Sequence, residues 1–471
     1  MTHAINETHD PNLRSWIESA NDPRTDFPVQ NLPLCRLTNP HQGRLCVRIG
    51  DEILDLVELE AAGLFRDIFE DPELNLLHGL SYTHERTYWM IDEDPATPAI
   101  FLILPAAFRT AVRRRLSALL GGTDDRLRKN DPLRQRALRS VSDVSLAPPM
   151  QIFRNYTDFY ASIHHATTVG SMFRPDNPLL PNYKHIPIGY HGRASSIIHS
   201  GTPIVRPRGQ QAPPDDNPAA GPTFGPCTML DYELEVGAVI GRANNLGEPV
   251  SLKDAEHHIL GLCLVNDWSA RDIQKWEYQP LGPFLAKSFA TTISPYVVTL
   301  EALAPFRCPA YKRLDGDPRP LPYLLNEHDQ SHGGFDITLE VSLRSADMEK
   351  RGLSPIVISR SNAFKDMYWT LAQMVTHHTS NGCNLQTGDL LASGTVSGTE
   401  SGTRGCLLES TWQGRGPDGK PLPRRPIELP TGEKRIFLQD GDEVILKGWC
   451  ERDGFRRIGF GECRGKILPA R

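Results

Sequence analysis

The chain has 471 residues and a formal net charge of −6 at pH 7, and its 23% charged and 39% hydrophobic residues are ordinary for a soluble globular protein of two or three domains. This weak negative charge gives no general case for a nucleic acid or an acidic membrane as a partner. The nine cysteines are scattered without a CxxC pair, so they indicate neither a disulfide framework nor a zinc site. The N-terminus is polar and no apolar stretch is long enough to cross a bilayer, so we expect a cytoplasmic protein.

Residues 1–148 are predicted to form a first domain. The run 44–57 predicts a β-hairpin whose turn is formed by Gly50 and Asp51. Between Leu116 and Leu138, leucines mix with many arginines, just after the cluster 113–115. A basic patch is one interpretation, but a solvated helical face is favoured because aspartates interrupt the stretch. The prolines at positions 148 and 149 indicate a domain boundary.

Residues 149–471 differ from the first domain, because they consist of short strand-like runs separated by glycine and proline. This pattern predicts a mostly β second domain with a few helices. The clearest strands are expected over 259–265, 335–343 and 441–449, and a helix is expected over 364–378.

Three acidic residues, Asp231, Glu233 and Glu235, alternate with apolar residues over 230–240. This period of two predicts a strand with one apolar face, so the carboxylates would stack along the other face and repel one another. A hard divalent cation with oxygen ligands would turn that repulsion into a binding site. The alternative is an acidic face exposed to solvent.

The residues that follow the strand 259–265 predict a helix with an aspartate or serine as its N-cap. One face of this helix is polar throughout and carries Asp267, Arg271, Gln274 and Tyr278. Apolar anchoring would come from Trp268, Ile273 and Trp276. The alternative is an exposed amphipathic helix with an ion pair between Asp267 and Arg271, but the position of Asp267 at a strand end favours a functional site.

Two charged residues stand within apolar runs, where a buried charge needs a partner. Lys287 would be a fixed cation suited to a developing oxyanion, with Glu409 or the acidic residues as its partners. The alternative is a surface lysine with a buried stem. Glu409 lies in a strand-like run and would pair with a histidine or a lysine. Thr395 lies in a glycine-flanked loop, which lets the backbone approach a small ligand.

His165 is a candidate general base, because histidine titrates near neutral pH. It follows Asp158 and Tyr160, which share one face if their run is extended. The chain contains 16 histidines, so a single histidine has a weak claim, and His164 is the adjacent rival.

Together these motifs resemble the fumarylacetoacetate hydrolase family. The matching runs are 156–160, 165–167, 187–196, 231–235, 266–278, 280–285, 287–289, 381–385, 390–395 and 459–461. They cover most of 150–471 and, more weakly, the N-terminal domain. The departures are Ala286 and Ala290, which replace glycines, and a loop over Arg415–Lys434 that looks long and to which we assign no role.

The resemblance implies a mainly β fold: a small N-terminal SH3-like β-barrel over 1–148, then a large C-terminal mixed β-roll domain over 149–471 that binds metal and carries the catalytic site. It implies a cytoplasmic homodimer that acts on a small diketo acid. The implied reaction is hydrolysis of the carbon–carbon bond of 4-fumarylacetoacetate to fumarate and acetoacetate, the last step of phenylalanine, tyrosine and homogentisate degradation.

The resemblance also implies roles for individual residues. Ca²⁺ or Mg²⁺ would be held by Asp158, Glu233, Glu235 and Asp267. Asp231 is then not a ligand, and a second Mg²⁺ position would lie near Asp267, Lys287 and Thr291. His165 would be the general base with Glu409 as its companion, and the oxyanion would be surrounded by Arg271, Gln274 and Lys287. The substrate contacts would be Tyr160, Arg174, Tyr190, Gln274, Tyr278 and Thr395.

Two other functions compete with this one. Another metal-dependent reaction on the same fold, such as acylpyruvate hydrolysis, hydration or decarboxylation, is disfavoured because His165 and Glu409 occur together with a full-length N-terminal domain. A non-catalytic module stabilised by Ca²⁺ is disfavoured because it would have no use for a histidine, a lysine and an arginine that converge on the metal.

Overall fold

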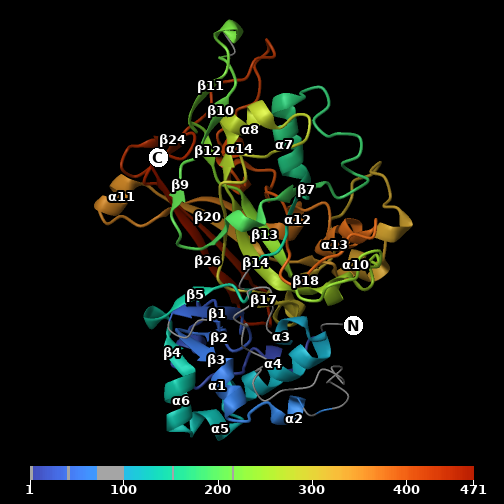
Figure 1. Cartoon of the computed structure of the whole chain (residues 1–471), viewed down its shortest axis with the longest axis vertical. Coiled ribbons are helices and arrows are strands. Elements are labelled where there is room, and N and C mark those ends of the chain that lie inside the picture. The colour runs from blue at the N-terminus through green and yellow to red at the C-terminus, as the bar shows by residue number, and fades with distance from the viewer. Residues whose placement is uncertain (1–3, 40–42, 70, 72–99, 151–152, 215–216) are drawn as a thin grey trace.

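The N-terminal part of the chain forms an antiparallel sheet in the computed structural model, which describes residues 4–39, 43–69, 71, 100–150, 153–214 and 217–471 (Figure 1). The five strands are β1 (Leu34–Asn39), β2 (Leu45–Ile49), β3 (Glu52–Asp55), β4 (Leu138–Ser140) and β5 (Ser145–Ala147), in the order β4-β3-β2-β1-β5. The expected hairpin is confirmed, because β2 and β3 pair on either side of Gly50. Gly50 has φ +50°, and a Cβ there would lie 2.3 Å from Ser19 Oγ, so only glycine suits this turn.

Six α-helices accompany this sheet in the described residues. They are α1 (Leu56–Ala61), α2 (Arg66–Phe69), α3 (Ile100–Ile103), α4 (Ala106–Gly121), α5 (Asp125–Arg128) and α6 (Asp131–Ala137). The helical prediction over 116–138 is confirmed as the end of α4, α5 and α6. The arginine cluster just before this stretch is not fully solvated. The guanidinium of Arg113 is buried and donates to Thr8 Oγ1 and to the carbonyls of Gln30 and Asn31.

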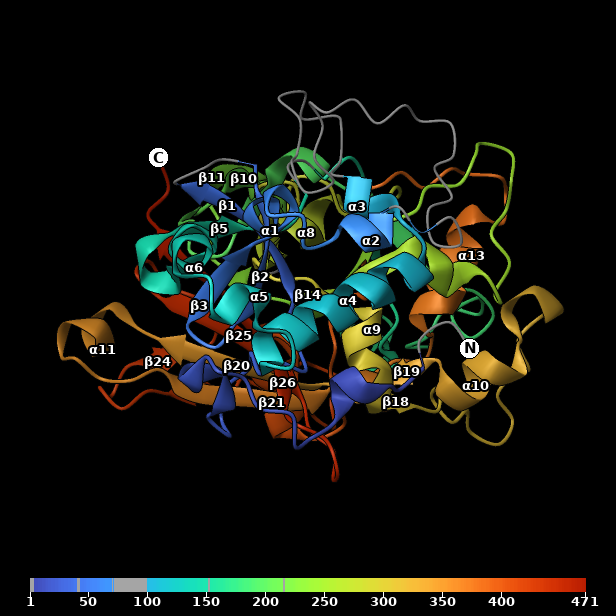
Figure 2. The same cartoon turned by 90° about the horizontal axis from the view of Figure 1, so that it is seen from below.

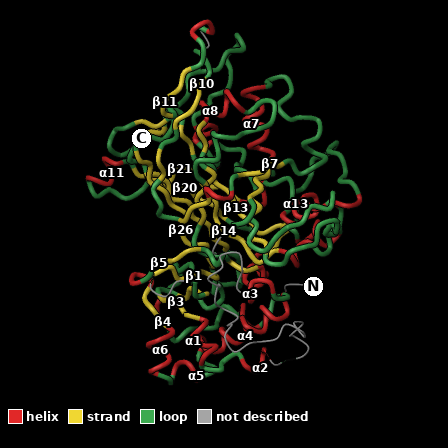
Figure 3. The backbone as a smooth tube through the Cα atoms, in the orientation of Figure 1, coloured by secondary structure: helices red, strands yellow, loops and turns green. Residues whose placement is uncertain are grey.

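The C-terminal part contains a curled eight-stranded sheet (Figures 1 and 3). Its strands are β6 (Tyr156–Phe159), β7 (Gly189–Gly192), β8 (Ile197–His199), β13 (Leu234–Ile240), β14 (Ile259–Asp267), β16 (Thr291–Ile293), β17 (Val298–Thr299) and β22 (Leu390–Ala392). The order is β7-β6-β22-β13-β14-β16-β8, with β17 also paired to β14. This arrangement brings β6, which is distant in sequence, to within one strand of β13.

A second, five-stranded sheet packs against the first. Its order is β21 (Ile356–Asn362), β20 (Thr338–Arg344), β25 (Glu443–Cys450), β26 (Ile458–Leu468) and β9 (Ile204–Val205). Close approach of the two sheets requires glycine, since a Cβ on Gly448 would lie 2.8 Å from Leu264 and one on Gly465 would lie 2.6 Å from Trp268. The strands expected over 259–265, 335–343 and 441–449 are confirmed as β14, β19 (Gly334–Phe335) with β20, and β25.

The remaining helices and strands lie around these two sheets. The helices are α7 (Ile163–Phe173), α8 (Arg271–Glu277), α9 (Leu300–Leu303), α10 (Glu327–His332), α11 (Ala346–Lys350), α12 (Ala363–Asp366), α13 (Leu371–Thr379) and α14 (Leu407–Ser410). The short strands are β10 (Arg208–Gln211), β11 (Thr223–Pro226), β12 (Leu230–Asp231), β15 (Ser269–Ala270), β18 (Arg307–Cys308), β23 (Ile427–Glu428) and β24 (Lys434–Arg435).

Two predicted helices differ from the structure. The helix expected over 364–378 is two helices, because Thr370 caps α13 by accepting a hydrogen bond from the N–H of Gln373. The helix expected from 266 onwards begins late: β14 continues to Asp267, and α8 starts at Arg271 after Ala270, which offers no side-chain cap. Trp276 is 43% exposed and is not an anchor, whereas Trp268 and Ile273 are buried as expected.

The hydrophobic core determines which face of the large sheet carries the acidic residues. Val236, Ala238, Leu262 and Leu264 belong to the cluster between the two sheets. Val239, Cys263 and Val265 belong to a second cluster that also contains N-terminal residues such as Leu34 and Phe108. Alternation along β13 and β14 places Glu235 and Asp267 on this second face. In Figure 2, seen from below, the N-terminal sheet and α4 lie across that side of the molecule.

The expected mainly β fold class is confirmed, with a small N-terminal β unit and a larger C-terminal β-roll. The division at 148 and 149 stays a prediction, because the second cluster joins residues from both sides of it. Among the described residues, none of the helices combines the length and apolarity that crossing a membrane requires.

Candidate active site

Four carboxylates meet at one end of the eight-stranded sheet. Asp158 comes from β6, Glu235 from β13 and Asp267 from the end of β14, while Glu233 directly precedes β13. One oxygen from each of them lies within 4.8 Å of the others. All four residues are at most 5% exposed, so the alternative of an acidic face exposed to solvent is wrong.

The donor set of this cluster fits a divalent cation. Within the part of the chain that the structure describes, both oxygens of Glu235 and Oδ1 of Asp158 are buried without a hydrogen-bond partner. Burial, followed by the neighbouring carboxylates, raises the pKa of Asp158 and of Glu235 well above their ordinary values. Buried oxygens that repel and lack donors are the ligands that a hard cation such as Ca²⁺ or Mg²⁺ takes. A divalent metal therefore fits this site.

Lys287 supplies one positive charge to the same cluster. Its Nζ lies 2.7 Å from Glu233 Oε2 and 2.7 Å from Asp267 Oδ2. Although burial favours the neutral amine, Asp267 and Glu233 hold the pKa of Lys287 above its usual value, so the group is an ammonium. The alternative of a surface lysine is therefore wrong. Of the partners considered for Lys287, the acidic residues are confirmed and Glu409 is wrong.

Two neutral donors also bind Asp267. Thr291 Oγ1 donates to Asp267 Oδ1 at 2.7 Å, and Tyr190 Oη donates to Asp267 Oδ2 at 2.8 Å. Burial raises the pKa of Tyr190 well above its ordinary value, which keeps the phenol protonated as a donor. Tyr190 and Thr291 therefore lie at the acidic cluster, and their roles stay predictions.

Arg271 links the acidic cluster to α14. Its guanidinium lies 2.6 Å from Glu233 Oε1 and 3.0 Å from Asp231 Oδ2, and it donates to Gln274 Oε1 at 3.1 Å. The alternative of an exposed helix with an ion pair between Asp267 and Arg271 is wrong, because Asp267 belongs to the strand and not to the helix. Asp231 lies outside the cluster, where it accepts hydrogen bonds from the N–H groups at 407 and 408 at the start of α14.

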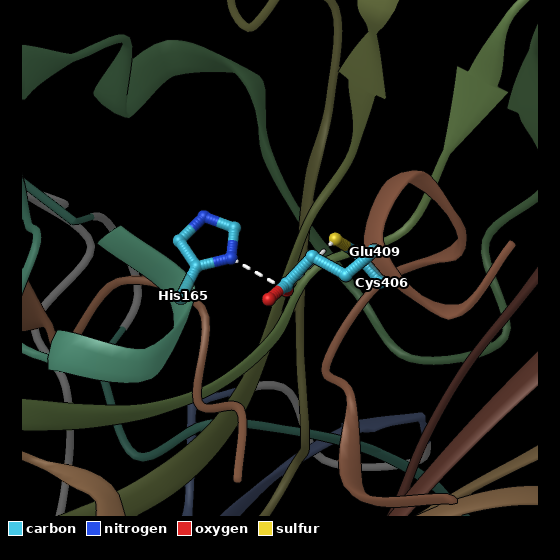
Figure 4. Close-up of side chains that lie close together, drawn as sticks. All are labelled: His165, Cys406 and Glu409. Atoms are coloured by element: carbon cyan, nitrogen blue, oxygen red, sulfur yellow. Dashed lines mark hydrogen bonds and ion pairs between the residues drawn. The ribbon is translucent and has the colours of Figure 1, made fainter. Parts of the chain in front are cut away.

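His165 and Glu409 form a buried pair beside this cluster (Figure 4). His165 Nδ1 lies 2.6 Å from Glu409 Oε2, and the second ring nitrogen points away from Glu409. Burial opposes ionisation, but His165 and Ser397 hold the pKa of Glu409 below its ordinary value. The strand expected around Glu409 is wrong, because this residue lies in the short helix α14. His164 is more exposed, and its Nε2 lies 3.7 Å from Asp366 Oδ1.

Cys406 also lies within reach of His165 and Glu409, so these three could in principle hold a metal (Figure 4). Burial and the nearby Glu409 raise the pKa of the Cys406 thiol well above its ordinary value. A protonated thiol is a poor metal ligand. The thiol instead donates to Glu409 Oε2 at 3.2 Å.

Among the predicted substrate contacts, Tyr160 packs on the histidine, whereas Arg174 and Tyr278 lie at the end of α7. The ring of Tyr160 stands edge-on to His165 with centroids 5.5 Å apart. Arg174 directly follows α7 and donates to the carbonyl of Pro178 at 3.2 Å. Tyr278 contacts Phe173 at the end of α7, with ring centroids 5.8 Å apart.

Thr395 is buried, and its Oγ1 has no hydrogen-bond partner among the described residues. The adjacent Gly394 has φ +75°, and a Cβ there would lie 2.1 Å from the carbonyl oxygen of Phe159. The glycine therefore lets this loop pack directly on the end of β6, which carries Asp158. The substrate-binding roles of all these residues stay predictions.

The sequence patterns miss Cys406 and two further residues that contact Glu409. Ser397 Oγ donates to Glu409 Oε2 at 2.6 Å, and Arg404 Nη1 lies 3.7 Å from Glu409 Oε1. Both come from the irregular segment between β22 and α14, where neither a helical nor a strand period indicates direction. Local spacing therefore offers no signal that could have found them.

Comparison with known proteins gives one consistent family. The protein-family model described as "Fumarylacetoacetate (FAA) hydrolase C-terminal" matches residues 151–468. The chain is 48% identical to fumarylacetoacetase of Bos taurus over 468 residues, which covers 97% of this chain and 99% of that protein. It is 46% identical to fumarylacetoacetase of Homo sapiens over 465 residues and 44% identical to that of Arabidopsis thaliana over 468 residues, with the same two coverages. The chain therefore belongs to the fumarylacetoacetate hydrolase family.

Proposed function

We propose that this protein is a hydrolase that cleaves the carbon–carbon bond of 4-fumarylacetoacetate to give fumarate and acetoacetate. Relatives that match nearly the whole chain are fumarylacetoacetases. The observation that carries the proposal is the buried pair of His165 and Glu409 beside four converging carboxylates. Cleavage of a 1,3-diketone needs an activated water, donors for the oxyanion and a way to hold the two ketone oxygens, and these groups match those needs.

We propose that Asp158, Glu233, Glu235 and Asp267 hold a Ca²⁺ or Mg²⁺ ion. When bound, this ion supplies Lewis acidity and a template for the diketone oxygens. Thr291 and Lys287 mark the region of a second Mg²⁺ position, where oxygens of Thr291 and Asp267 would be the ligands, since an ammonium has no lone pair to give.

His165 acts as the general base. With Glu409 ionised, Nδ1 carries the proton that Glu409 accepts, so Nε2 is the nitrogen with a free lone pair. Nε2 takes a proton from the attacking water, and Glu409 stabilises the imidazolium that forms. The same proton is then available to the departing enolate carbon.

Arg271, Gln274 and Lys287 surround the oxyanion that forms on the attacked carbonyl. Lys287 is an ammonium fixed by two carboxylates, and Nη2 of Arg271 is buried without a partner within the described chain. Such preorganised donors stabilise developing negative charge without reorganising. The substrate is held by Tyr160, Arg174, Tyr190, Gln274, Tyr278 and Thr395, with the Arg174 guanidinium facing a carboxylate.

The protein works as a cytoplasmic homodimer of two-domain subunits, 1–148 and 149–471, in the last step of phenylalanine and tyrosine degradation through homogentisate. Support for the dimer comes from the loop after α8, where Leu281 is 95% and Phe284 68% exposed. Large apolar side chains exposed this close together mark surfaces that another protein covers.

Fumarate release tests the reaction directly. The purified protein with Mg²⁺ or Ca²⁺ should convert fumarylacetoacetate to fumarate and acetoacetate in equal amounts, and acylpyruvates should be turned over much more slowly. His165→Ala is the matched control for contaminating activity. Preference for an acylpyruvate, or no fumarate from metal-loaded protein, would overturn the proposal.

A further inference from the structure

A ring of hydrogen bonds closes around the catalytic pair and contains two serines that the mechanism above leaves unused. Ser397 Oγ donates to Glu409 Oε2 at 2.6 Å, and Glu409 Oε2 binds His165 Nδ1 at 2.6 Å. Ser162 Oγ donates to the carbonyl of Ser397 at 3.1 Å and accepts from the N–H of His165 at 3.4 Å. The ring thus runs from the His165 side chain back to the His165 backbone.

Ser162 anchors the backbone side of this ring. It is the N-cap of α7, and His165 is the third residue of that helix. A serine N-cap accepts from the N–H at this helix position, so Ser162 determines where the base emerges from α7. Because the same hydroxyl contacts the Ser397 backbone, the start of α7 and the Ser397 loop are held together.

Ser397 anchors the side-chain half of the ring. It is fully buried, and its Oγ accepts a hydrogen bond from the N–H of Gly405 at 2.9 Å. A hydroxyl has one proton to donate, and this proton goes to Glu409. The orientation of the Ser397 hydroxyl is therefore fixed by both its donor and its acceptor.

The two oxygens of Glu409 have very different surroundings. Oε2 takes all three donors within hydrogen-bond reach, from His165, Ser397 and Cys406. Oε1 accepts no hydrogen bond from the described residues, and Arg404 Nη1 lies 3.7 Å away from it. Arg404 attracts the carboxylate towards itself and away from His165, whereas Ser397 holds it in place.

We infer that Ser397 is a positioning residue for the general base, acting through Glu409. The inference rests on the proposed role of His165 and Glu409. Without the Ser397 hydroxyl, the carboxylate rotates towards Arg404, and the imidazole loses the partner that aims Nε2 at the water. A misplacement of about 1 Å at a reacting group costs on the order of 100-fold in rate.

Ser397→Ala tests this inference by kinetics. We expect kcat for fumarate release to fall by about 10- to 100-fold with KM nearly unchanged, because the substrate-binding groups stay in place. Ser397→Cys keeps a side chain of similar shape, slightly larger, with a weaker donor, and its kcat should be intermediate. The matched control is Ser410→Ala on α14, whose hydroxyl donates to the carbonyl of Cys406 and should not alter kcat or KM.

A purely structural role would give a different pattern. Ser397→Ala also leaves the Gly405 N–H without its acceptor, so some loss of melting temperature is expected. The substitution is therefore repeated in Glu409→Gln. If Ser397 acts through Glu409, it should change the residual kcat of that variant by less than about twofold, whereas independent effects would multiply. Multiplying effects overturn the inference.

The remaining outcomes separate the inference from the proposed function. Wild-type protein that releases no fumarate overturns the proposed function itself. Active wild type with Ser397→Ala at wild-type kcat overturns only the positioning role. If Ser397→Ala does not fold, Ser397→Cys decides: reduced kcat at an unchanged melting temperature supports the inference, and wild-type kcat overturns it.

Discussion

Lys287 Nζ lies 2.7 Å from Asp267 Oδ2, deep inside a cluster that holds more negative than positive charge. The same ammonium reaches Glu233 Oε2, so one lysine spans two of the four carboxylates. This position serves two purposes at once. It offsets part of the repulsion between the acids, and in the proposed mechanism it also fixes a cation beside the oxyanion.

Lys287→Met keeps the aliphatic stem and removes the charge. We expect kcat to fall by about 10²–10³-fold, the range seen when an oxyanion donor is lost, with a smaller change in KM. Steady-state kinetics and melting curves with and without Mg²⁺ measure both effects. Lys253→Met, at an exposed lysine, is the control and should behave as wild type. An unstable variant whose folded fraction retains near-wild-type kcat would show that the lysine is structural only.

Glu235→Gln should separate metal binding from folding. Burial raises the pKa of Glu235 above its ordinary 4.5, so ionisation of this group disfavours the folded state without metal. The stability of metal-free wild type should therefore fall as pH rises above 4.5. The amide does not ionise, so metal-free Glu235→Gln should lose less over this range and melt higher at pH 7.

The same variant should bind Ca²⁺ or Mg²⁺ more weakly, because a charged ligand is lost. Melting curves from pH 4 to 8 in a chelator, and titration calorimetry with each ion, measure the two effects. Asp231→Asn is not a suitable control, since Asp231 anchors α14. Metal-free Glu235→Gln that melts below metal-free wild type at pH 7 would contradict the repulsion argument.

Removal of the metal should lower both activity and stability. A ligand that binds only the folded state at 100 times its Kd stabilises it by about 2.7 kcal/mol, and here it also relieves repulsion among buried carboxylates. Chelation should therefore reduce the melting temperature and abolish fumarate release, and added Ca²⁺ or Mg²⁺ should restore both. Full activity in a sample shown to be free of metal would sink the metal hypothesis.

The acidic cluster shows how far local sequence patterns reach. The period of two over 230–240 correctly indicates a strand and a concentration of carboxylates that fits a metal ion. It includes Glu233 and Glu235. Asp231 fits the same period, but it turns away to α14 because the strand is interrupted between β12 and β13. Asp158 and Asp267 join the site through strand pairing, and no local spacing encodes which strands become neighbours.

The sequence predicts the first residue of a helix less well than it predicts a strand. A helix that starts at 266 would place Asp267, Arg271 and Gln274 on one face, but β14 keeps Asp267 in the sheet through its pairing with Thr291. This tertiary pairing overrides the N-cap preference of the aspartate. Of the two apolar residues expected to anchor α8, Ile273 is buried and Trp276 is 43% exposed. Turn residues in the sequence led to a correct prediction where the backbone needs a glycine, as in the hairpin turn at Gly50.

The two adjacent histidines provide the last test, since they differ in surroundings and not in chemistry. His165 is buried with Nδ1 on Glu409, while His164 is partly exposed with Asp366 3.7 Å from its Nε2. His165→Ala should therefore lose about 100-fold or more in kcat, the contribution of a positioned general base. His164→Ala should lose little, and it controls for the removal of an imidazole from α7. Both variants should be compared at equal folded fraction by circular dichroism and fumarate release. Equal losses at the two positions would mean that proton transfer does not depend on the Glu409 contact, and His165 would lose its assignment as the base.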